Sequence, residues 1–209
     1  MSRTARGPAV ELAELAGPAG RAELAGRAEL AGPAELDEEP GPGAVACRRL
    51  YRMLAAGVTV VTTRAGQDPV GLTASSVTSV SLRPPMLLVC VATGSGSLAA
   101  IRRQRAFAVH LLREEQAATA EAFSRPGHDP RRFAGRAHRD VLGVPVLADV
   151  LAWSVCFLVS EHRHGDHCVV VGQVVIAHTG AGRPLIWHDR RYAGLAAGEL
   201  GQGLAPPPA

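Results

Sequence analysis

The chain has 209 residues, of which 47% are hydrophobic, and a formal net charge of +3. This length suits one domain with a sizeable core, and no apolar run is long enough to span a membrane. The arginines near the N-terminus are not followed by an apolar segment, so we expect no secretory signal and predict a cytoplasmic protein.

The sequence contains neither lysine nor asparagine. This excludes a Schiff-base lysine and a Walker-type phosphate loop, so arginines, hydroxyls or backbone N–H groups must hold any anion. Residues 1–43 carry a net charge of −4 and the remainder +7. Scattered positive charge and only 4% aromatic residues favour an anionic small molecule over nucleic acid as the ligand. The four cysteines are widely spaced, which favours reduced thiols.

Residues 1–43 are of low complexity. The motif Ala-Glu-Leu-Ala-Gly recurs at 13–17, 22–26 and 28–32, and the glycines and prolines interrupt any helix. We therefore predict a disordered N-terminal tail over 1–43, a folded domain over 44–200 and a flexible C-terminal tail over 201–209.

Within the domain the pattern is mostly strand. Helices are predicted over residues 46–55, 98–103 and 113–124. Strands are predicted over 57–63, 70–81, 86–92, 106–112, 151–162, 168–178 and 183–187. A turn is predicted over 64–68, a hairpin junction at 165–166 and a loop over 125–146. Many strands and few helices favour a β-barrel, which leaves no long edge unpaired.

The segment 71–85 is rich in hydroxyl side chains and ends in two prolines. On an extended backbone one face would carry hydroxyls and the other face apolar side chains. The two faces are Thr73, Ser75, Ser79 and Ser81 against Leu72, Ala74, Val80 and Leu82. Hydroxyls donate and accept hydrogen bonds, so this face suits a polar ligand lying along a sheet, although a solvent-facing strand has the same pattern.

A second candidate is the loop 94–97, which follows a buried strand and precedes a short helix. This order presents backbone N–H groups to a phosphate. Thr93, Arg102 and Arg103 lie next to it in the sequence.

The sequence gives little support for two other kinds of site, a metal site and a hydrolase nucleophile. His162, His164, His167 and Cys168 fall on both faces of one hairpin with no second cluster to complete a site, so we predict no metal. Ser75 and Ser76 lack the G-x-S-x-G motif of a hydrolase nucleophile.

Taken together in chain order, the motifs resemble the flavin reductase family. They are G-V-T-V-V-T-T at 57–63, T-A-S-S-V-T-S-V-S-L-R-P-P at 73–85, G-D-H at 165–167 and P-L-I-W-H-D-R-R-Y at 184–192. The resemblance implies a six-stranded antiparallel split β-barrel of Greek-key type, with a few peripheral helices. It also implies a homodimer that reduces FMN, FAD or riboflavin with NADH or NADPH and passes the reduced flavin to a partner monooxygenase.

The resemblance also implies roles for individual residues. His167 would stand at the nicotinamide as the catalytic residue, and Tyr192 would close the site. The ribityl chain and phosphate would meet Thr73, Ala74, Ser75 and Ser76. The isoalloxazine ring would meet Ser79, Val80, Ser81, Leu82 and Pro85. The next wall would be formed by Cys90, Thr93, Ser95 and Ser97.

The sequence departs from the family pattern in two ways. His110 stands where the family often has asparagine, and an arginine (102, 103, 131 or 132) must replace any phosphate-binding lysine. Three alternative functions remain open at this point. They are a flavoprotein oxidoreductase with tightly bound FMN, a non-catalytic flavin- or haem-binding barrel, and an interaction protein that docks through residues 1–43. The sequence does not decide between FMN and FAD, or between NADH and NADPH.

Overall fold

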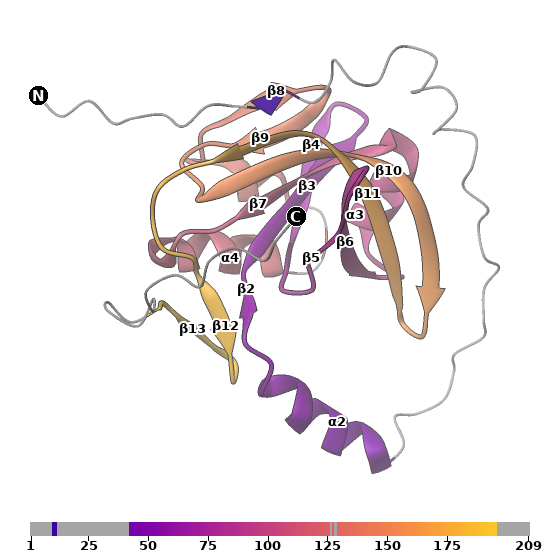
Figure 1. Cartoon of the computed structure of the whole chain (residues 1–209), viewed down its shortest axis with the longest axis vertical. Coiled ribbons are helices and arrows are strands. Elements are labelled where there is room, and N and C mark those ends of the chain that lie inside the picture. The colour runs from indigo at the N-terminus through magenta and orange to yellow at the C-terminus, as the bar shows by residue number, and fades with distance from the viewer. Residues whose placement is uncertain (1–9, 12–41, 126, 128, 196–209) are drawn as a thin grey trace, which may run out of the picture.

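The computed structural model describes residues 10–11, 42–125, 127 and 129–195. One large antiparallel sheet dominates it, with the strand order β4-β3-β7-β10-β11-β6-β5 (Figure 1). Its strands are β3 (Thr59–Ala65), β4 (Asp68–Ala74), β5 (Thr78–Leu82), β6 (Pro85–Ala92), β7 (Ala106–Leu111), β10 (Ala152–His164) and β11 (His167–Thr179). The short strand β1 (Val10–Glu11) also pairs with β11.

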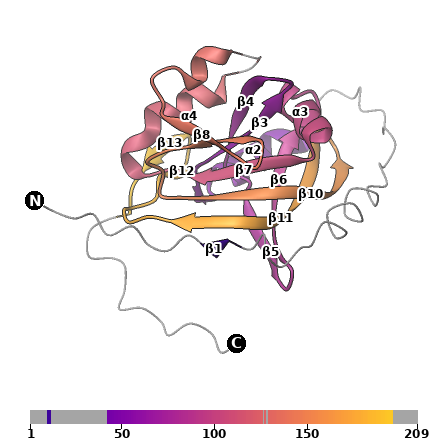
Figure 2. The same cartoon turned by 90° about the horizontal axis from the view of Figure 1, so that it is seen from above.

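Smaller elements surround this sheet. A three-stranded sheet joins β2 (Ala56–Gly57), β12 (Ile186–His188) and β13 (Arg191–Ala193), and a hairpin joins β8 (His138–Val141) to β9 (Val144–Leu147). The helices are α2 (Pro42–Arg52), α3 (Gly96–Gln104) and α4 (Ala117–Ser124), with 3-10 turns at Glu114–Gln116 and Pro130–Phe133. Figure 2 shows α3 and α4 beside β3 and β4, while β5 projects at the opposite side.

The prediction of a mainly β, antiparallel fold is confirmed. The backbone ladder, however, does not close into a six-stranded barrel, because β4 and β5 are the outer strands of the sheet in the described chain. The predicted single strand over 70–81 is in fact two strands, interrupted after Ala74 and resumed at Thr78. A register shift between Ser79 and Ser81 then breaks the expected alternation of faces.

The predicted loop over 125–146 was also wrong, because it contains the β8–β9 hairpin and a 3-10 turn. The hairpin turn places Leu142 and Gly143 at positive φ angles of 52° and 81°. The N–H of Gly143 also donates to Oδ1 of Asp140 at 2.9 Å. Leucine rarely adopts such a φ, so this turn has no recognisable sequence signal. The prediction also missed β13.

The central strand β3 explains why threonine occurs in the core. Thr59, Thr62 and Thr63 are all buried. Their hydroxyls donate to backbone carbonyls: Thr59 to Ala74 at 2.7 Å, Thr63 to Ala106 at 2.7 Å, and Thr62 to Pro145. Buried hydroxyls are costly unless they are bonded in this way.

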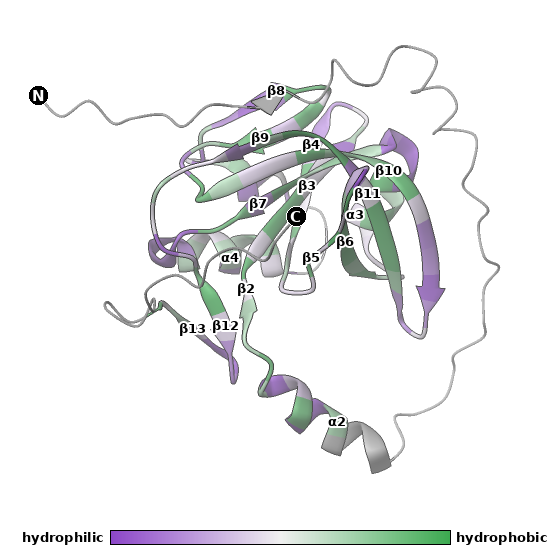
Figure 3. Ribbon diagram, viewed as in Figure 1, coloured by the Kyte–Doolittle hydropathy of each residue, from purple (hydrophilic) through white to green (hydrophobic). Residues whose placement is uncertain are grey.

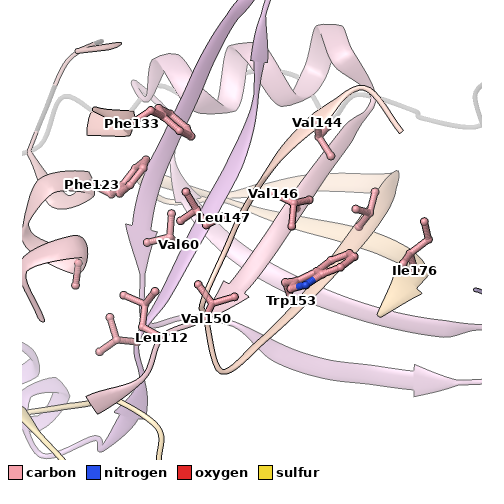
Figure 4. Packing of buried hydrophobic residues seen from close by; sticks show 14 of the residues in the cluster. Val60, Leu112, Phe123, Phe133, Val144, Val146, Leu147, Val150, Trp153 and Ile176 are labelled. Atoms are coloured by element: carbon pink, nitrogen blue, oxygen red, sulfur yellow. The ribbon is translucent and has the colours of Figure 1, made fainter. Parts of the chain in front are cut away.

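The core lies on both faces of the sheet. One cluster contains Val60, Leu112, Phe123, Phe133 and Trp153 and lies beneath the β8–β9 hairpin and α4 (Figure 4). The other contains Val61, Leu98, Ile101, Phe107 and Val109, and is covered by α3. This second cluster fixes α3 against β3 and β4.

Several apolar side chains stay exposed. Helix α2 lies away from the sheet (Figure 3) and carries Leu50 and Tyr51 at the surface, and Leu54 just after the helix is exposed as well. On β5, Val80 and Leu82 are 47% and 88% exposed. This half of the predicted apolar face is therefore not buried within one chain, whereas Ala74 on β4 is buried and Leu72 packs against the same core cluster. Apart from Val10–Glu11 and Pro42–Gly43, the predicted N-terminal tail lies outside the described residues, as does the tail over 201–209. No helix in the described ranges is long and apolar enough to cross a membrane.

Candidate functional site

A cavity of about 840 Å³ lies between β4, the end of β6, the start of α3 and the segment that follows α4. Of the fifteen residues to which the resemblance gives a role, eight line it. They are Thr73, Ala74, Ser75, Ser76, Cys90, Ser95, Ser97 and His167. The fold therefore brings together three segments that are far apart in the sequence, namely the hydroxyl-rich segment, the loop before α3 and the histidine-rich hairpin.

Ser76 connects the end of β4 to β6. Its hydroxyl donates to the carbonyl of Cys90 at 3.0 Å and accepts the N–H of the same residue at 3.2 Å. The hydroxyl thus replaces the pair of backbone hydrogen bonds that a neighbouring strand would make with Cys90, at a point where β4 and β6 are not paired. Its hydroxyl therefore shapes the cavity wall, whereas Ser75 beside it is exposed.

Thr73 has a similar structural task. Its hydroxyl donates to the carbonyl of Ala120 in α4 at 2.6 Å. Two residues earlier, a Cβ on Gly71 would lie 2.8 Å from the carbonyl oxygen of Val61 and 3.0 Å from the Phe123 ring. Glycine thus allows α4 to pack closely on β4 beside the cavity.

The loop before α3 places a helix N-terminus at the cavity wall. Gly94, Ser95, Gly96 and Ser97 all line the cavity, and Ser95 is the N-cap residue. The Ser95 side chain makes no capping hydrogen bond. The first N–H groups of a helix have no intrahelical acceptors and carry partial positive charge, so this end of the cavity favours an anion.

Of the four arginines considered from the sequence, two line the cavity: Arg103 and Arg132. Arg102 instead pairs with the buried Glu161 at 2.8 Å. Arg131 pairs with Asp129 at 3.0 Å on the surface.

Nothing in the sequence indicates that Arg132 is buried. Only 7% of it is exposed. Its guanidinium donates to the carbonyls of Gly71 at 3.0 Å and Gly127 at 2.6 Å, and to that of Arg125. Arg132 therefore ties the segment after α4 to β4 and builds one wall of the cavity.

His167 stands at the rim of the cavity, at the tip of the β10–β11 hairpin. Its Nδ1 lies 2.7 Å from Oδ1 of Asp166. That hydrogen bond, together with the charge of His167, lowers the pKa of the Asp166 carboxyl. A carboxylate can only accept a hydrogen bond, so Nδ1 carries a proton and donates the bond to Asp166. The other ring nitrogen, Nε2, is not used in this bond.

The other seven residues to which the resemblance gives a role do not line the cavity. They are Ser79, Val80, Ser81, Leu82, Pro85, Thr93 and Tyr192. The first five lie on or next to β5, which the interruption after Ala74 separates from β4. Tyr192 packs against Trp187 with ring centroids 4.9 Å apart, and burial raises the pKa of its hydroxyl, with Glu121 adding to the effect.

The histidine-rich hairpin does not form a metal site in the described chain. His162 and His164 are exposed, while Cys168 is buried toward the core. The His, Cys, Asp and Glu side chains of the described residues form no group of three that could hold a metal ion.

Sequence reasoning missed part of the cavity wall. Arg125, Asp129 and Phe133 line it, yet they lie in a segment that was interpreted only as a loop. The possible signal was R-R-F at 131–133, where a phenylalanine follows two arginines in a polar stretch.

Comparison with known proteins agrees with this geometry. The model of the flavin reductase like domain matches residues 50–196. The chain belongs to the flavin reductase family.

Among curated relatives of this flavin reductase domain is the reductase component of 4-nitrophenol 4-monooxygenase/4-nitrocatechol 2-monooxygenase from Rhodococcus opacus. It is 39% identical over 145 residues, which cover 69% of this chain and 77% of the relative. The NADH:FMN oxidoreductase of Rhodococcus erythropolis is 37% identical over 152 residues, 69% of this chain and 78% of the relative.

Solved structures show the same similarity. The NADH:FAD oxidoreductase SgcE6 of Streptomyces globisporus, in complex with NAD and FAD fragments, has a TM-score of 0.70 at 31% identity. The match covers 79% of this chain and 99% of that chain. BorF, the flavin reductase component of a bacterial two-component tryptophan halogenase, has a TM-score of 0.68 at 32% identity, with 74% and 99% covered.

Proposed function

We propose that this protein is an NAD(P)H-dependent flavin reductase that transfers a hydride from nicotinamide to FMN or FAD. The observation that carries the proposal is the composition of the cavity. An apolar strand wall, hydroxyls, a helix N-terminus and arginines share one space of about 840 Å³. A flavin nucleotide has the matching parts, namely an apolar ring, a hydroxylated chain and a phosphate, so the residues present fit this group.

The residues of the cavity divide into two tasks in this proposal. Ser95, Ser97 and the N–H groups at the start of α3 hold the phosphate, and the exposed hydroxyl of Ser75 meets the ribityl chain. Thr73 and Ser76 hold the wall in shape, because their hydroxyls already bond to backbone groups.

A bound flavin supplies the ring that accepts the hydride, and the protein orients the two ring systems and excludes water from between them. His167 contributes to this orientation from the cavity rim. With Nδ1–H donating to Asp166, Nε2 is the ring nitrogen that contacts the carboxamide of the nicotinamide in this proposal.

The remaining predicted contacts belong to a second copy of the chain in this proposal. Large apolar side chains are left exposed on β5 (Val80 and Leu82) and on or just after α2 (Leu50, Tyr51 and Leu54). A homodimer would bury such surfaces. The ring site would then include Ser79, Ser81 and Pro85, with Tyr192 closing it. The core would be a split barrel whose gap is bridged by Ser76.

The reduced flavin would go to a separate monooxygenase. Relatives of this chain are named as reductase components of such systems, and that naming supports the role.

Oxidation of NADH and of NADPH by the purified protein tests the proposal, with and without added FMN, FAD or riboflavin. We expect oxidation that requires added flavin and stops when the flavin is omitted. Protein that binds flavin without oxidising either nucleotide would contradict the proposal and favour a binding module. Protein purified with bound flavin that needs a further acceptor would instead identify a self-contained oxidoreductase.

A further inference from the structure

The cavity extends well beyond the helix N-terminus assigned to the first phosphate. The bonds between Ser76 and Cys90 place the end of β6, and with it the start of α3, beside the C-terminal end of β4. At the other end, the hydroxyl of Thr63 donates to the carbonyl of Ala106 at 2.7 Å, and Thr63 pairs with Val70. Helix α3 therefore runs antiparallel to β4, with its last turn next to Val70.

The length of this space follows from the geometry of its two walls. From Gly96 to Arg103 the helix rises about 10 Å at 1.5 Å per residue. From Ala74 back to Val70 the strand covers about 13 Å. Gly96, Arg103, Val70 and Ala74 all line the cavity. A phosphate at the start of α3 thus leaves a second compartment toward Arg103 and Val70, which we call the outer half.

The wall of the outer half is built by the buried Arg132. Its bonds to the carbonyls of Gly71, Gly127 and Arg125 fix the segment after α4 over β4. Next to it, Phe133 packs edge-on against Phe123 with ring centroids 5.0 Å apart. Both phenylalanines line the cavity, but they are buried in the core with 1% and 6% of their surface exposed, so they support this wall from behind.

The charges of the outer half suit a second anionic group. Arg103 and Arg125 line it, and within the part of the chain that the structure describes neither forms a salt bridge. Their neighbours behave differently, because Arg102 pairs with Glu161 and Arg131 with Asp129. Asp129 also faces the cavity, and its carboxylate already accepts from the backbone N–H and Nε of Arg131 at 2.9 and 3.0 Å.

We infer that the outer half is a binding site for the adenosine monophosphate portion of FAD, so that this protein prefers FAD over FMN. The inference rests on the proposed function. FMN ends at the phosphate next to α3. FAD continues with a second phosphate, which Arg103 and Arg125 would bind, and an adenosine, whose base would stack on the planar guanidinium of the exposed Arg125.

The direct test compares the Kd values of FAD, FMN and riboflavin for the wild-type protein, from flavin fluorescence without nicotinamide present. We expect FAD to bind about tenfold more tightly than FMN or better, as one charge-assisted contact and a stacked base would give. AMP serves as the probe of the outer half. It should compete with FAD and bind together with FMN.

Single substitutions test whether Arg125 is responsible for the preference for FAD over FMN. Arg125→Ala should raise the Kd of FAD about tenfold while changing that of FMN much less, and Arg125→Lys should lie in between. Arg48→Ala is the matched control, since it removes the same charge from the exposed face of α2. The control should keep the wild-type ratio of the two Kd values.

The outcomes separate this inference from the proposed function. Equal Kd values for FAD and FMN, with no competition by AMP, would overturn the inference even if flavin-dependent NADH oxidation is intact. An unchanged ratio in Arg125→Ala would overturn the assigned position. Absence of any flavin reduction would overturn the proposed function itself.

Discussion

Thr93 holds the tip of the β10–β11 hairpin through the carbonyl oxygen of Asp166. The Thr93 N–H donates to it at 2.9 Å and the Thr93 hydroxyl at 3.2 Å. The carboxylate of Asp166 in turn bonds to Nδ1 of His167. Although Thr93 does not line the cavity, it thus connects the loop before α3 to the histidine at the rim.

Thr93→Val should therefore impair the use of NADH more than the binding of flavin. Losing one hydrogen bond of about 1 kcal/mol would raise KM for NADH by roughly fivefold, because the hairpin holding His167 loses a fixed position. Steady-state kinetics and flavin titration measure the two effects. Thr93→Ser keeps the hydroxyl and should restore wild-type values, and equal behaviour of the two variants would count against this role.

Ser75 and Ser76 form a matched pair for separating binding from stability. Ser76→Ala leaves the N–H and the carbonyl of Cys90 without their partner, so the free energy of unfolding should fall by about 1 to 2 kcal/mol. Ser75→Ala should leave stability unchanged and weaken flavin binding. Urea denaturation and flavin titration of both variants give the comparison. A destabilised Ser75→Ala with an unaffected Ser76→Ala would reverse the assignment.

His110 makes the stability of the fold depend on pH. The ring is fully buried, with Nδ1 at 2.8 Å from the carbonyl of Val60 and Nε2 accepting the N–H of Leu147 at 3.0 Å. Burial lowers the pKa of His110 from 6.5 to about 4, partly offset by the bond to Val60. Below pH 6.5 the unfolded chain therefore binds a proton that the folded chain does not.

Stability should accordingly fall as the pH drops from about 6.5 toward 4, by at most about 3 kcal/mol, and this contribution should be absent above pH 6.5. Urea denaturation at pH 5 and pH 7.5 measures it. His110→Asn retains a donor to Val60 and removes the titrating ring, so its stability should depend less on pH. The same pH dependence in both proteins would show that another group is responsible.

The proposed dimer can be tested at Leu82. Leu82→Arg places a charge where an apolar surface would be buried, so the mass in solution should change from that of two chains to that of one. Light scattering after size exclusion measures it. Leu142→Arg is the control, because Leu142 is also an exposed leucine, in the β8–β9 turn. A monomeric wild type would contradict the dimer proposal.

The sequence predicted the strands whose signal is local. The strand over 86–92 and the hairpin junction at 165–166 are present as β6 and at the turn before His167, because a short apolar run and a glycine turn act over a few residues. The predicted alternation of apolar and hydroxyl side chains along one strand is wrong between Ala74 and Thr78, where the strand is interrupted. There the hydroxyl of Ser76, a contact to a distant strand, replaces the ladder, and local periodicity carries no information about such a contact.

In the candidate site, too, some residues could be predicted from the sequence and others could not. Hydroxyls and the loop before α3 were recognisable because their chemistry is visible in the residue types. Arg125, Arg132 and Phe133 were not, since the burial of Arg132 depends on carbonyls of Gly71 and Gly127 that come close only in the folded chain. Likewise, the sequence could not show that Thr73 and Ser76 bond to backbone groups.

The measurement that tests the central claim most directly is flavin-dependent NADH oxidation by Ser97→Asp. An acidic residue in the first turn of α3 favours the helix but repels a phosphate. We therefore expect kcat/KM for FMN to fall about tenfold or more while that for riboflavin, which has no phosphate, stays near the wild-type value. If FMN and riboflavin are affected equally, or neither is affected, the phosphate does not bind at the start of α3 and the account of this cavity is contradicted.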